Sequence, residues 1–208
     1  MQPHLLSKRI VPVAVIDSVE DAVPLALALK QGGLPLIEVT LRTPAALACI
    51  HAIRQACPEI SVGAGTIIDP DQVAAAIHAG AEFGVSPGTN PPVIEAAVEQ
   101  GLFFVPGVMT PSDIEAAMGL GCRLLKFFPA EPAGGVPMLK ALAGPYEPAG
   151  VKFIPLGGIS PQNMPQYLAL PCVAAVGGSW ICERSLIRQR KWSEITGLAA
   201  AAISQANG

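Results

Sequence analysis

A capping residue directly before a proline recurs five times along the chain, and this feature constrains the fold most. The pairs are Thr43-Pro44, Asp69-Pro70, Asn90-Pro91, Thr110-Pro111 and Ser160-Pro161, spaced 20 to 26 residues apart with a gap of 50 before the last. Side-chain oxygens of such residues satisfy free backbone N–H groups at a helix start, and proline fits the first helical position because it has no N–H to lose. Each pair therefore predicts the start of a helix.

Eight short apolar stretches alternate with the predicted helices. They are residues 9–16, 34–41, 60–66, 81–87, 102–108, 122–128, 151–158 and 173–179. Strands that are buried on both faces read as apolar runs of this kind. Eight strand–helix units in 208 residues predict an α/β fold, a compact (β/α)8 TIM barrel. The alternative is an open doubly wound sheet, but the first turn lacks the G-x-G-x-x-G sequence of that fold.

Length and composition indicate one domain with a large core. No linker or low-complexity tract divides the chain, so we expect residues 1–208 to form a single barrel domain. The net charge of −3 argues against a nucleic-acid binder, whose surface would be basic. Residues 153–182 contain no charged side chain, but prolines and glycines interrupt them, so they predict buried core and no membrane span.

The cysteines and histidines predict a reduced protein without a metal. The five cysteines are an odd number, widely spaced and mostly in apolar surroundings, which favours free core residues in a cytoplasmic protein. The N-terminal residues lack the long apolar segment of a secretory signal. The histidines show no metal-ligand spacing with one another or with cysteine, so we expect no metal site.

Two ionisable residues lie within apolar stretches. Lys126 is flanked by leucines and phenylalanines, and Glu38 lies between Ile37 and Val39. Side chains alternate between the two faces of a strand, and the outer face of a barrel strand packs against apolar helices. We therefore expect both side chains to point inward and to share the interior of the barrel.

Lys126 and Glu38 admit two interpretations. One is a structural ion pair that fills a small core, and the other is an amine held for nucleophilic attack with a carboxylate beside it. At an ordinary lysine pKa of about 10.4, only a few lysines in ~10⁴ are neutral at pH 7. Burial disfavours an ammonium ion, whereas a nearby carboxylate favours it. The second interpretation therefore requires the apolar surroundings to prevail, with Glu38 acting through water or as a proton carrier.

Paired glycines end the last two predicted strands. A single Gly-Gly is most often only a tight turn, but Gly157-Gly158 and Gly177-Gly178 lie on adjacent strands. TIM barrels frequently bind a phosphate at this corner, where backbone N–H groups approach the anion closely. Ser179 adds a hydroxyl, so these residues predict a phosphate site.

Seven stretches, in this order, resemble the 2-keto-3-deoxy-6-phosphogluconate (KDPG) aldolases, which also act on 4-hydroxy-2-oxoglutarate. They are LIEVTLRTP, VGAGTI, VSPGTN, VPGVMTPSDI, LLKFFPAE, GGISPQN and VGGSW, and the resemblance runs from about residue 11 to residue 180. It implies a homotrimeric class I aldolase with a (β/α)8 fold and no metal or other cofactor. Its reaction would cleave KDPG to pyruvate and glyceraldehyde 3-phosphate, and 4-hydroxy-2-oxoglutarate to pyruvate and glyoxylate.

The resemblance also implies roles for individual residues. Lys126 would form the Schiff base, and Glu38 would be the acid/base group. The other implied contacts are Arg42 and Thr66 at the substrate carboxylate, Pro87 and Phe128 in the pocket wall, and Gly157, Gly158, Gly178 and Ser179 at the phosphate.

This chain departs from the pattern of the family at two positions. Leu156 stands where relatives usually have threonine, and a relative that acts on the galactonate epimer has an aliphatic residue there. A 2-keto-3-deoxy-6-phosphogalactonate aldolase is therefore an alternative. Asp17 stands where relatives often have a basic residue, so weaker anion binding is expected.

Two other classes of protein fit parts of the pattern. A phosphosugar isomerase on the same barrel would keep the glycine pairs and an acid/base pair but form no imine. A non-catalytic barrel would bind phosphate and release no pyruvate. Fold alone does not separate these classes, whereas the chemistry of Lys126 does.

Overall fold

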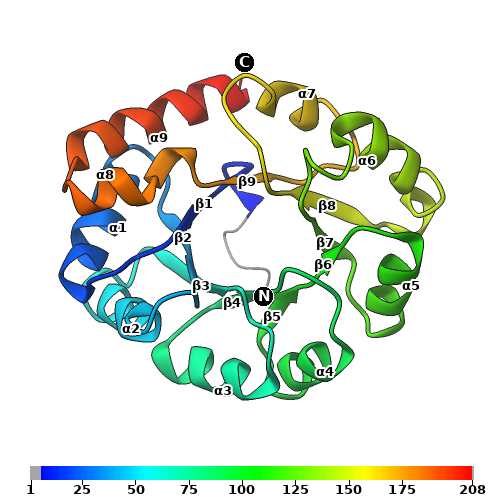
Figure 1. The fold of residues 1–208 in the computed structure, drawn as a ribbon, viewed down its shortest axis with the longest axis horizontal. Coiled ribbons are helices and arrows are strands. Elements are labelled where there is room, and N and C mark those ends of the chain that lie inside the picture. The colour runs from blue at the N-terminus through cyan, green and yellow to red at the C-terminus, as the bar shows by residue number, and fades with distance from the viewer. Residues whose placement is uncertain (1–5, 208) are drawn as a thin grey trace.

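The computed structural model describes residues 6–207, without the side chain of Asn207, so residues 1–5 and 208 of the predicted domain lie outside the described residues. Strands and helices alternate along the chain. Figure 1 shows the strands arranged in a ring, with the helices outside it. The predicted parallel α/β architecture is confirmed.

All the strands of the ring run parallel. They are β1 (Ile10–Ala14), β2 (Leu36–Thr40), β3 (Ser61–Gly65), β4 (Phe83–Val85), β5 (Phe103–Val105), β6 (Gly107–Val108), β7 (Leu124–Phe127), β8 (Lys152–Pro155) and β9 (Val176–Gly178). Hydrogen bonding divides them into a six-stranded sheet of order β5-β4-β3-β2-β1-β9 and a three-stranded sheet of order β6-β7-β8. The expected continuous barrel of eight strands is therefore confirmed only in part.

Pro106 explains one of the two breaks between the sheets. It interrupts the predicted strand 102–108, and a proline has no N–H to donate to a neighbouring strand. Its carbonyl accepts a hydrogen bond from the Lys126 N–H, so β6 pairs with β7. At the other break the Phe153 N–H donates to the Cys172 carbonyl, and Phe153 forms an isolated bridge with Val173. The Phe153 carbonyl in turn accepts from the Ala174 N–H, so two hydrogen bonds link β8 to the segment that precedes β9.

The helices cover the outside of the ring. The α-helices are α1 (Ala22–Gln31), α2 (Ala46–Ala56), α3 (Pro70–Ala79), α4 (Pro91–Glu99), α5 (Pro111–Gly119), α6 (Gly135–Ala143), α7 (Met164–Leu168), α8 (Arg184–Arg188) and α9 (Trp192–Asn207). Short 3-10 helices are η2 (Val19–Asp21), η3 (Glu147–Ala149) and η4 (Trp180–Cys182). In the part of the chain that the structure describes, no helix combines the length and the apolar character needed to cross a membrane.

Three of the five proline pairs start helices as predicted. Asp69 and Thr110 form capping boxes at α3 and α5, and α4 begins at Pro91 although the Asn90 amide donates to the Ile68 carbonyl and does not cap the helix.

The predictions for Thr43 and Ser160 are wrong, because turns follow both prolines. The Thr43 hydroxyl donates to the Ile16 carbonyl, and α2 begins only at Ala46. The Ser160 N–H donates to the Asn163 side chain, and α7 begins at Met164.

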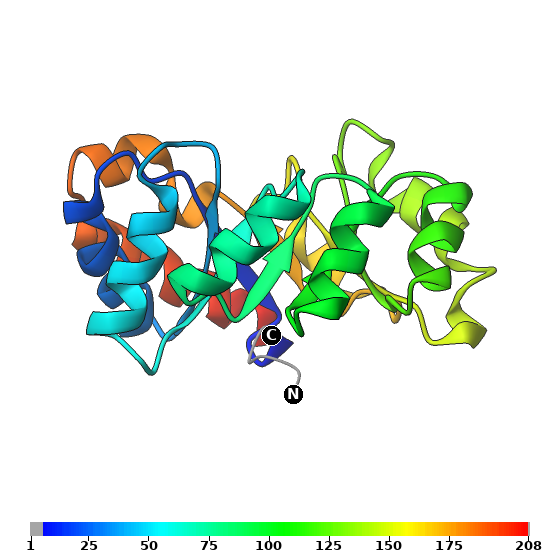
Figure 2. The ribbon, with the colours of Figure 1, turned by 90° about the horizontal axis from the view of Figure 1, so that it is seen from below.

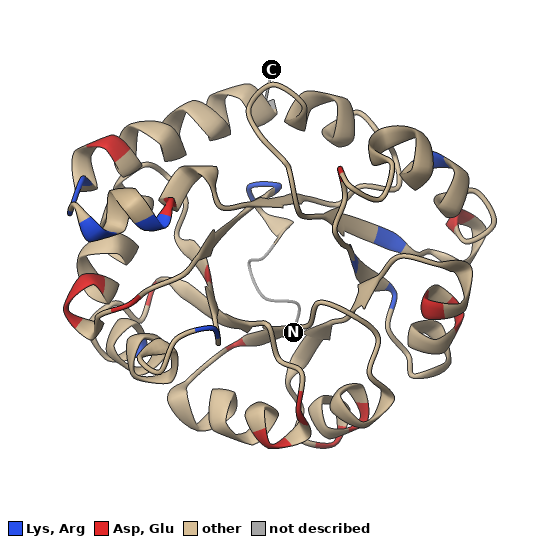
Figure 3. Ribbon diagram, in the orientation of Figure 1, with Lys and Arg blue, Asp and Glu red and all other residues tan. Residues whose placement is uncertain are grey.

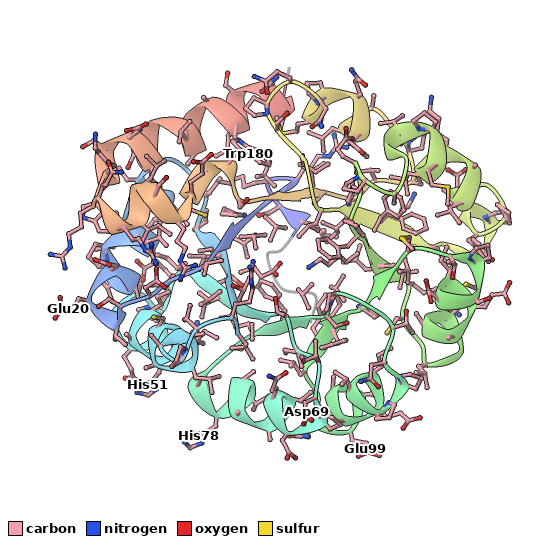
Figure 4. All side chains as sticks on the ribbon, viewed as in Figure 1. Glu20, His51, Asp69, His78, Glu99 and Trp180 are labelled. Carbon is pink, nitrogen blue, oxygen red and sulfur yellow. The ribbon has the colours of Figure 1, made fainter. Side chains whose placement is uncertain are left out.

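The core has two parts, one inside the ring and one between the ring and the helices. Every residue of β2 and β3 is buried, as expected for strands that are covered on both faces. Figure 3 shows that most charged residues lie on helices and outer loops. Figure 4 shows side chains filling the ring, while the labelled His51 and His78 lie on the outer helices. Lys126 and Glu38 are therefore exceptional, because they are buried at 5% and 1% exposure.

Candidate active site

A cavity of about 390 Å³ opens at the carboxyl ends of the strands. Its lining includes nine predicted site residues, namely Glu38, Arg42, Thr66, Pro87, Lys126, Phe128, Gly157, Gly178 and Ser179. The structure therefore brings together residues that the sequence separates by up to 141 positions, from Glu38 to Ser179. Gly158 does not line the cavity, and a Cβ there would lie 2.7 Å from the Glu131 Cβ.

Glu38 lies at the floor of this cavity, on β2 between β1 and β3. A Cβ on Gly65 of β3 would overlap the Glu38 carboxylate, so glycine there provides the space that this side chain occupies. No described residue donates a hydrogen bond to its Oε1. Burial raises the pKa of Glu38, while the positive charge of Lys126 acts in the opposite direction. The carboxyl therefore holds a proton more readily than an exposed glutamate does.

Lys126 reaches the same floor from β7. Its Nζ lies 4.0 Å from Glu38 Oε1 and 4.9 Å from the centroid of the Phe128 ring. The first distance is within the range of an ion pair but longer than a hydrogen bond. Beneath both groups lies a small cavity of about 10 Å³, walled mainly by apolar side chains such as Ile154 and Val105. The amine therefore faces the active-site cavity from a largely apolar floor.

Arg42 and Thr66 lie above this floor, after β2 and β3. The Arg42 side chain is exposed, and no described residue accepts a hydrogen bond from its guanidinium. Thr66 has a φ of 62°, a left-handed conformation that is rare for a β-branched residue and costs about 1–3 kcal/mol. An unpaired guanidinium beside a hydroxyl residue held in this conformation suits the binding of a carboxylate.

Gly157, which follows β8, and Gly178, at the end of β9, also line the cavity. Gly157 has a φ of 94°, and a Cβ there would lie 3.0 Å from the Pro129 Cα. A Cβ on Gly178 would overlap the Trp180 ring, which Figure 4 labels. Ser179 follows at the exposed edge. Glycine is thus required at both strand ends, where an anion could approach the backbone closely.

Sequence reasoning missed several cavity residues. Thr40, Val13 and Val15 line it as well. The alternation that directs Glu38 inward directs Thr40 the same way, so this residue could have been found. The Thr40 hydroxyl donates to the Ala14 carbonyl over 3.1 Å, which links β2 to β1 beside the cavity.

Comparisons with known proteins agree on one family. The model of the family described as "KDPG and KHG aldolase" matches residues 1–198. The KHG/KDPG aldolase of Escherichia coli K12 is 45% identical over 202 residues, which cover 97% of this chain and 94% of that protein. The 2-dehydro-3-deoxy-phosphogluconate aldolase of Dickeya dadantii is 44% identical over 202 residues, with the same coverage.

A solved structure gives the same result. The KDPG aldolase of Legionella pneumophila, with pyruvate captured at low pH as a covalent carbinolamine intermediate, superposes with a TM-score of 0.92. Its sequence is 43% identical, and the match covers 97% of this chain and 98% of the other.

Proposed function

The chain belongs to the KDPG and KHG aldolase family, and on that premise we propose that it is a class I aldolase. It cleaves 2-keto-3-deoxy-6-phosphogluconate to pyruvate and glyceraldehyde 3-phosphate, and 4-hydroxy-2-oxoglutarate to pyruvate and glyoxylate. The observation that carries the proposal is a lysine at 5% exposure whose Nζ reaches a cavity 4.0 Å from a buried carboxyl. A buried amine beside a proton carrier is the arrangement that Schiff-base chemistry requires.

The reaction begins when the neutral Lys126 Nζ attacks the C2 ketone of the substrate. Glu38, directly or through a water, protonates the hydroxyl of the carbinolamine, which leaves as water and gives the iminium. The C4 hydroxyl then gives its proton to the ionised Glu38, directly or through a water, and the C3–C4 bond breaks. C4 leaves as the aldehyde product, and the electron pair of the broken bond moves through C3 to the iminium nitrogen, which gives an enamine. Protonation at C3 and hydrolysis release pyruvate and restore Lys126. The raised pKa of Glu38 suits a group that both donates and accepts protons.

The remaining cavity residues bind the two ends of the substrate. Arg42 offers a bidentate, permanently charged fork to the C1 carboxylate, beside the Thr66 hydroxyl. Pro87 and Phe128 form the wall along the carbon chain. Gly157, Gly178 and Ser179 receive the phosphate, and Gly158 supports the turn at that corner.

Borohydride reduction in the presence of pyruvate tests this proposal. The wild-type protein should lose activity and carry a pyruvate-derived adduct on the peptide that contains Lys126. The matched control is Lys152→Arg, which changes an exposed lysine at the start of β8 and should still be labelled. Labelling that spares Lys126 would contradict the proposal. A phosphosugar isomerase would resist borohydride, and a non-catalytic barrel would release no pyruvate.

One observation favours a second substrate class. Leu156 is buried and lines the cavity where relatives usually have threonine, and Gly177 faces it at the adjacent strand. An apolar wall at this point favours acceptance of the galactonate epimer of the substrate. The ratio of kcat/KM for the two substrates decides between them. A higher value for the gluconate substrate supports a KDPG aldolase, and a higher value for the galactonate substrate supports the alternative.

We propose three further properties of the whole chain. Residues 1–208 form one domain in which the two sheets act as a single closed (β/α)8 barrel, supported by the hydrogen bonds at both breaks.

The protein is a homotrimer, supported by exposed apolar side chains such as Ile68 at 57% and Val98 at 60%. Five free cysteines support a cytoplasmic location. Light scattering should give a mass about three times that of the 21.4 kDa chain.

A further inference from the structure

The active-site cavity continues into a second hollow of about 460 Å³ at the rim of the molecule. The two share Val13, Val15, Arg42 and Ser179. The second adds Cys182, Glu183, Arg184 and Ser185, from η4 and α8. Figure 2 shows α8, in orange, at the upper edge of the molecule. Arg184 thus lies where the predicted phosphate corner opens to solvent.

Arg184 is held in a fixed orientation by Asp17, which follows β1. Arg184 Nε donates to Asp17 Oδ2 over 2.8 Å, and Arg184 Nη2 donates to Asp17 Oδ1. Arg188 donates to the same Oδ2 over 2.8 Å. Both guanidinium groups lower the pKa of Asp17, so the carboxylate stays ionised at neutral pH. One carboxylate between two guanidinium groups leaves one positive charge in excess.

The hydrogen bonds to Asp17 leave one edge of the Arg184 guanidinium free. They use Nε and Nη2, and no described residue accepts a hydrogen bond from Nη1. A guanidinium has five N–H donors, so the edge formed by Nη1 and Nη2 can still bind a second anion. The side chain is 48% exposed, and a ligand in the hollow can therefore reach it.

The proposed substrate needs a cation at this place. A phosphate monoester carries about −1.5 to −2 charges at pH 7. Gly157, Gly178 and Ser179, the described residues of this corner, offer neutral donors, and Arg42, which lines both hollows, is assigned to the carboxylate. Glu183 also lines the hollow and is exposed, as Arg184 is, so its carboxylate offsets part of this positive charge but leaves the free edge of the Arg184 guanidinium available for hydrogen bonds.

We propose that Arg184, oriented by Asp17, binds the phosphate of the substrate and thereby discriminates phosphorylated from unphosphorylated substrates. This inference rests on the proposed aldolase function and names the residue that sets its substrate class. It also revises the expectation of weaker anion binding from Asp17. The acid at that position holds a guanidinium beside the phosphate corner.

The two proposed substrates provide the test, because one extends to a phosphate on C6, whereas 4-hydroxy-2-oxoglutarate has no phosphate and ends in a carboxylate at C5, too short to reach the second hollow. Arg184→Gln should raise KM for the phosphorylated substrate about 10-fold and leave KM for 4-hydroxy-2-oxoglutarate unchanged. Competitive inhibition by inorganic phosphate should weaken to the same degree. Arg184→Lys keeps the positive charge but loses the forked guanidinium. Its KM for the phosphorylated substrate should therefore lie between that of the wild type and that of Arg184→Gln.

Arg188→Gln is the matched control. Arg188 lies on the same helix and pairs with the same oxygen of Asp17, but it does not line the hollow. It should leave KM for 4-hydroxy-2-oxoglutarate unchanged and raise KM for the phosphorylated substrate much less than Arg184→Gln does, because it removes a charge of the cluster but no donor to the phosphate. Asp17→Asn should raise KM for the phosphorylated substrate less than Arg184→Gln does, because the guanidinium remains but is no longer held.

Three outcomes overturn the inference while the aldolase function stands. They are an equal KM change for both substrates, no KM change in Arg184→Gln, and a fall in KM in Asp17→Asn. Failure of the wild-type protein to release pyruvate from either substrate would instead overturn the proposed function itself.

Discussion

Two charge clusters lie at the carboxyl ends of the strands, and they have opposite properties. Lys126 and Glu38 lie inside the ring, 4.0 Å apart without a hydrogen bond, and burial raises the pKa of the carboxyl. Asp17 lies at the rim with Arg184 and Arg188, and hydrogen bonds lower the pKa of its carboxyl. The two carboxyl groups thus have pKa values shifted in opposite directions. Burial without partners favours groups that exchange protons, whereas exposed, paired groups stay charged and suit ligand binding.

The largest expected effect comes from removing the buried amine. Lys126→Met should lower kcat by at least about 10⁴-fold, because Lys126 is the one primary amine among the described residues that line the cavity. The fold should persist, since an apolar chain of similar length suits the apolar floor. Steady-state pyruvate release and circular dichroism measure the two effects. Substantial residual turnover would assign the chemistry to another residue.

Loss of the buried carboxyl should have the next largest effect. Glu38→Gln keeps the shape but cannot carry protons, so kcat should fall about 10²- to 10⁴-fold. Single-turnover trapping should show slower imine formation in this variant. An unchanged rate would mean that Glu38 only fills space, which is the structural alternative for this pair.

The packing around the Glu38 carboxyl can be disturbed while the carboxyl itself is kept. Gly65→Ala adds a Cβ that overlaps the Glu38 carboxylate, so it should destabilise the fold by about 1–3 kcal/mol and lower kcat. Gly119→Ala is the control, because its Cβ would meet no atom within 4 Å. Urea unfolding of both variants measures the difference. Equal stability of the two would contradict the described position of Glu38.

The two clusters should also differ in the sign of their pH dependence. Because the folded pKa of Glu38 is raised, its contribution to stability is present at low pH and is lost as pH rises through that pKa. Glu38→Gln should therefore gain stability relative to wild type as pH increases. The folded pKa of Asp17 is lowered, so its contribution is present above its unfolded pKa and is lost as pH falls.

Asp17→Asn provides the second half of that comparison. Its stability deficit should be small, because exposed ion pairs contribute little, and should disappear at acid pH. Chemical unfolding across a pH series measures both variants against wild type. Slopes of the same sign would contradict the contrast between the two clusters.

The sequence predicted the buried cluster better than the exposed one. Alternation within apolar strands was enough to direct Lys126 and Glu38 inward, because only one face of such a strand can accept a charge. The pairing of Asp17 with Arg184 spans 167 residues and depends on β1 lying beside β9. Local patterns contain no information about that contact.

Turns and sheet breaks were also hard to predict. Thr43 and Ser160 precede prolines as capping residues do, but their polar groups bond elsewhere and the helices begin later. Pro106 can be seen within an apolar run of the sequence. Its effect on the sheet, however, depends on the pairing of β6, which follows this proline, with β7. These outcomes are determined by tertiary partners, which local sequence does not specify.

The central claim is that Lys126 forms an imine with pyruvate at a floor shared with Glu38. A crystal structure of the protein after borohydride reduction with pyruvate tests it most directly. We predict continuous density from the Lys126 Nζ to C2 of the ligand, with the ligand carboxylate at Arg42 and Thr66. Pyruvate bound without that bond, or a Lys126 side chain that faces bulk solvent, would contradict the account.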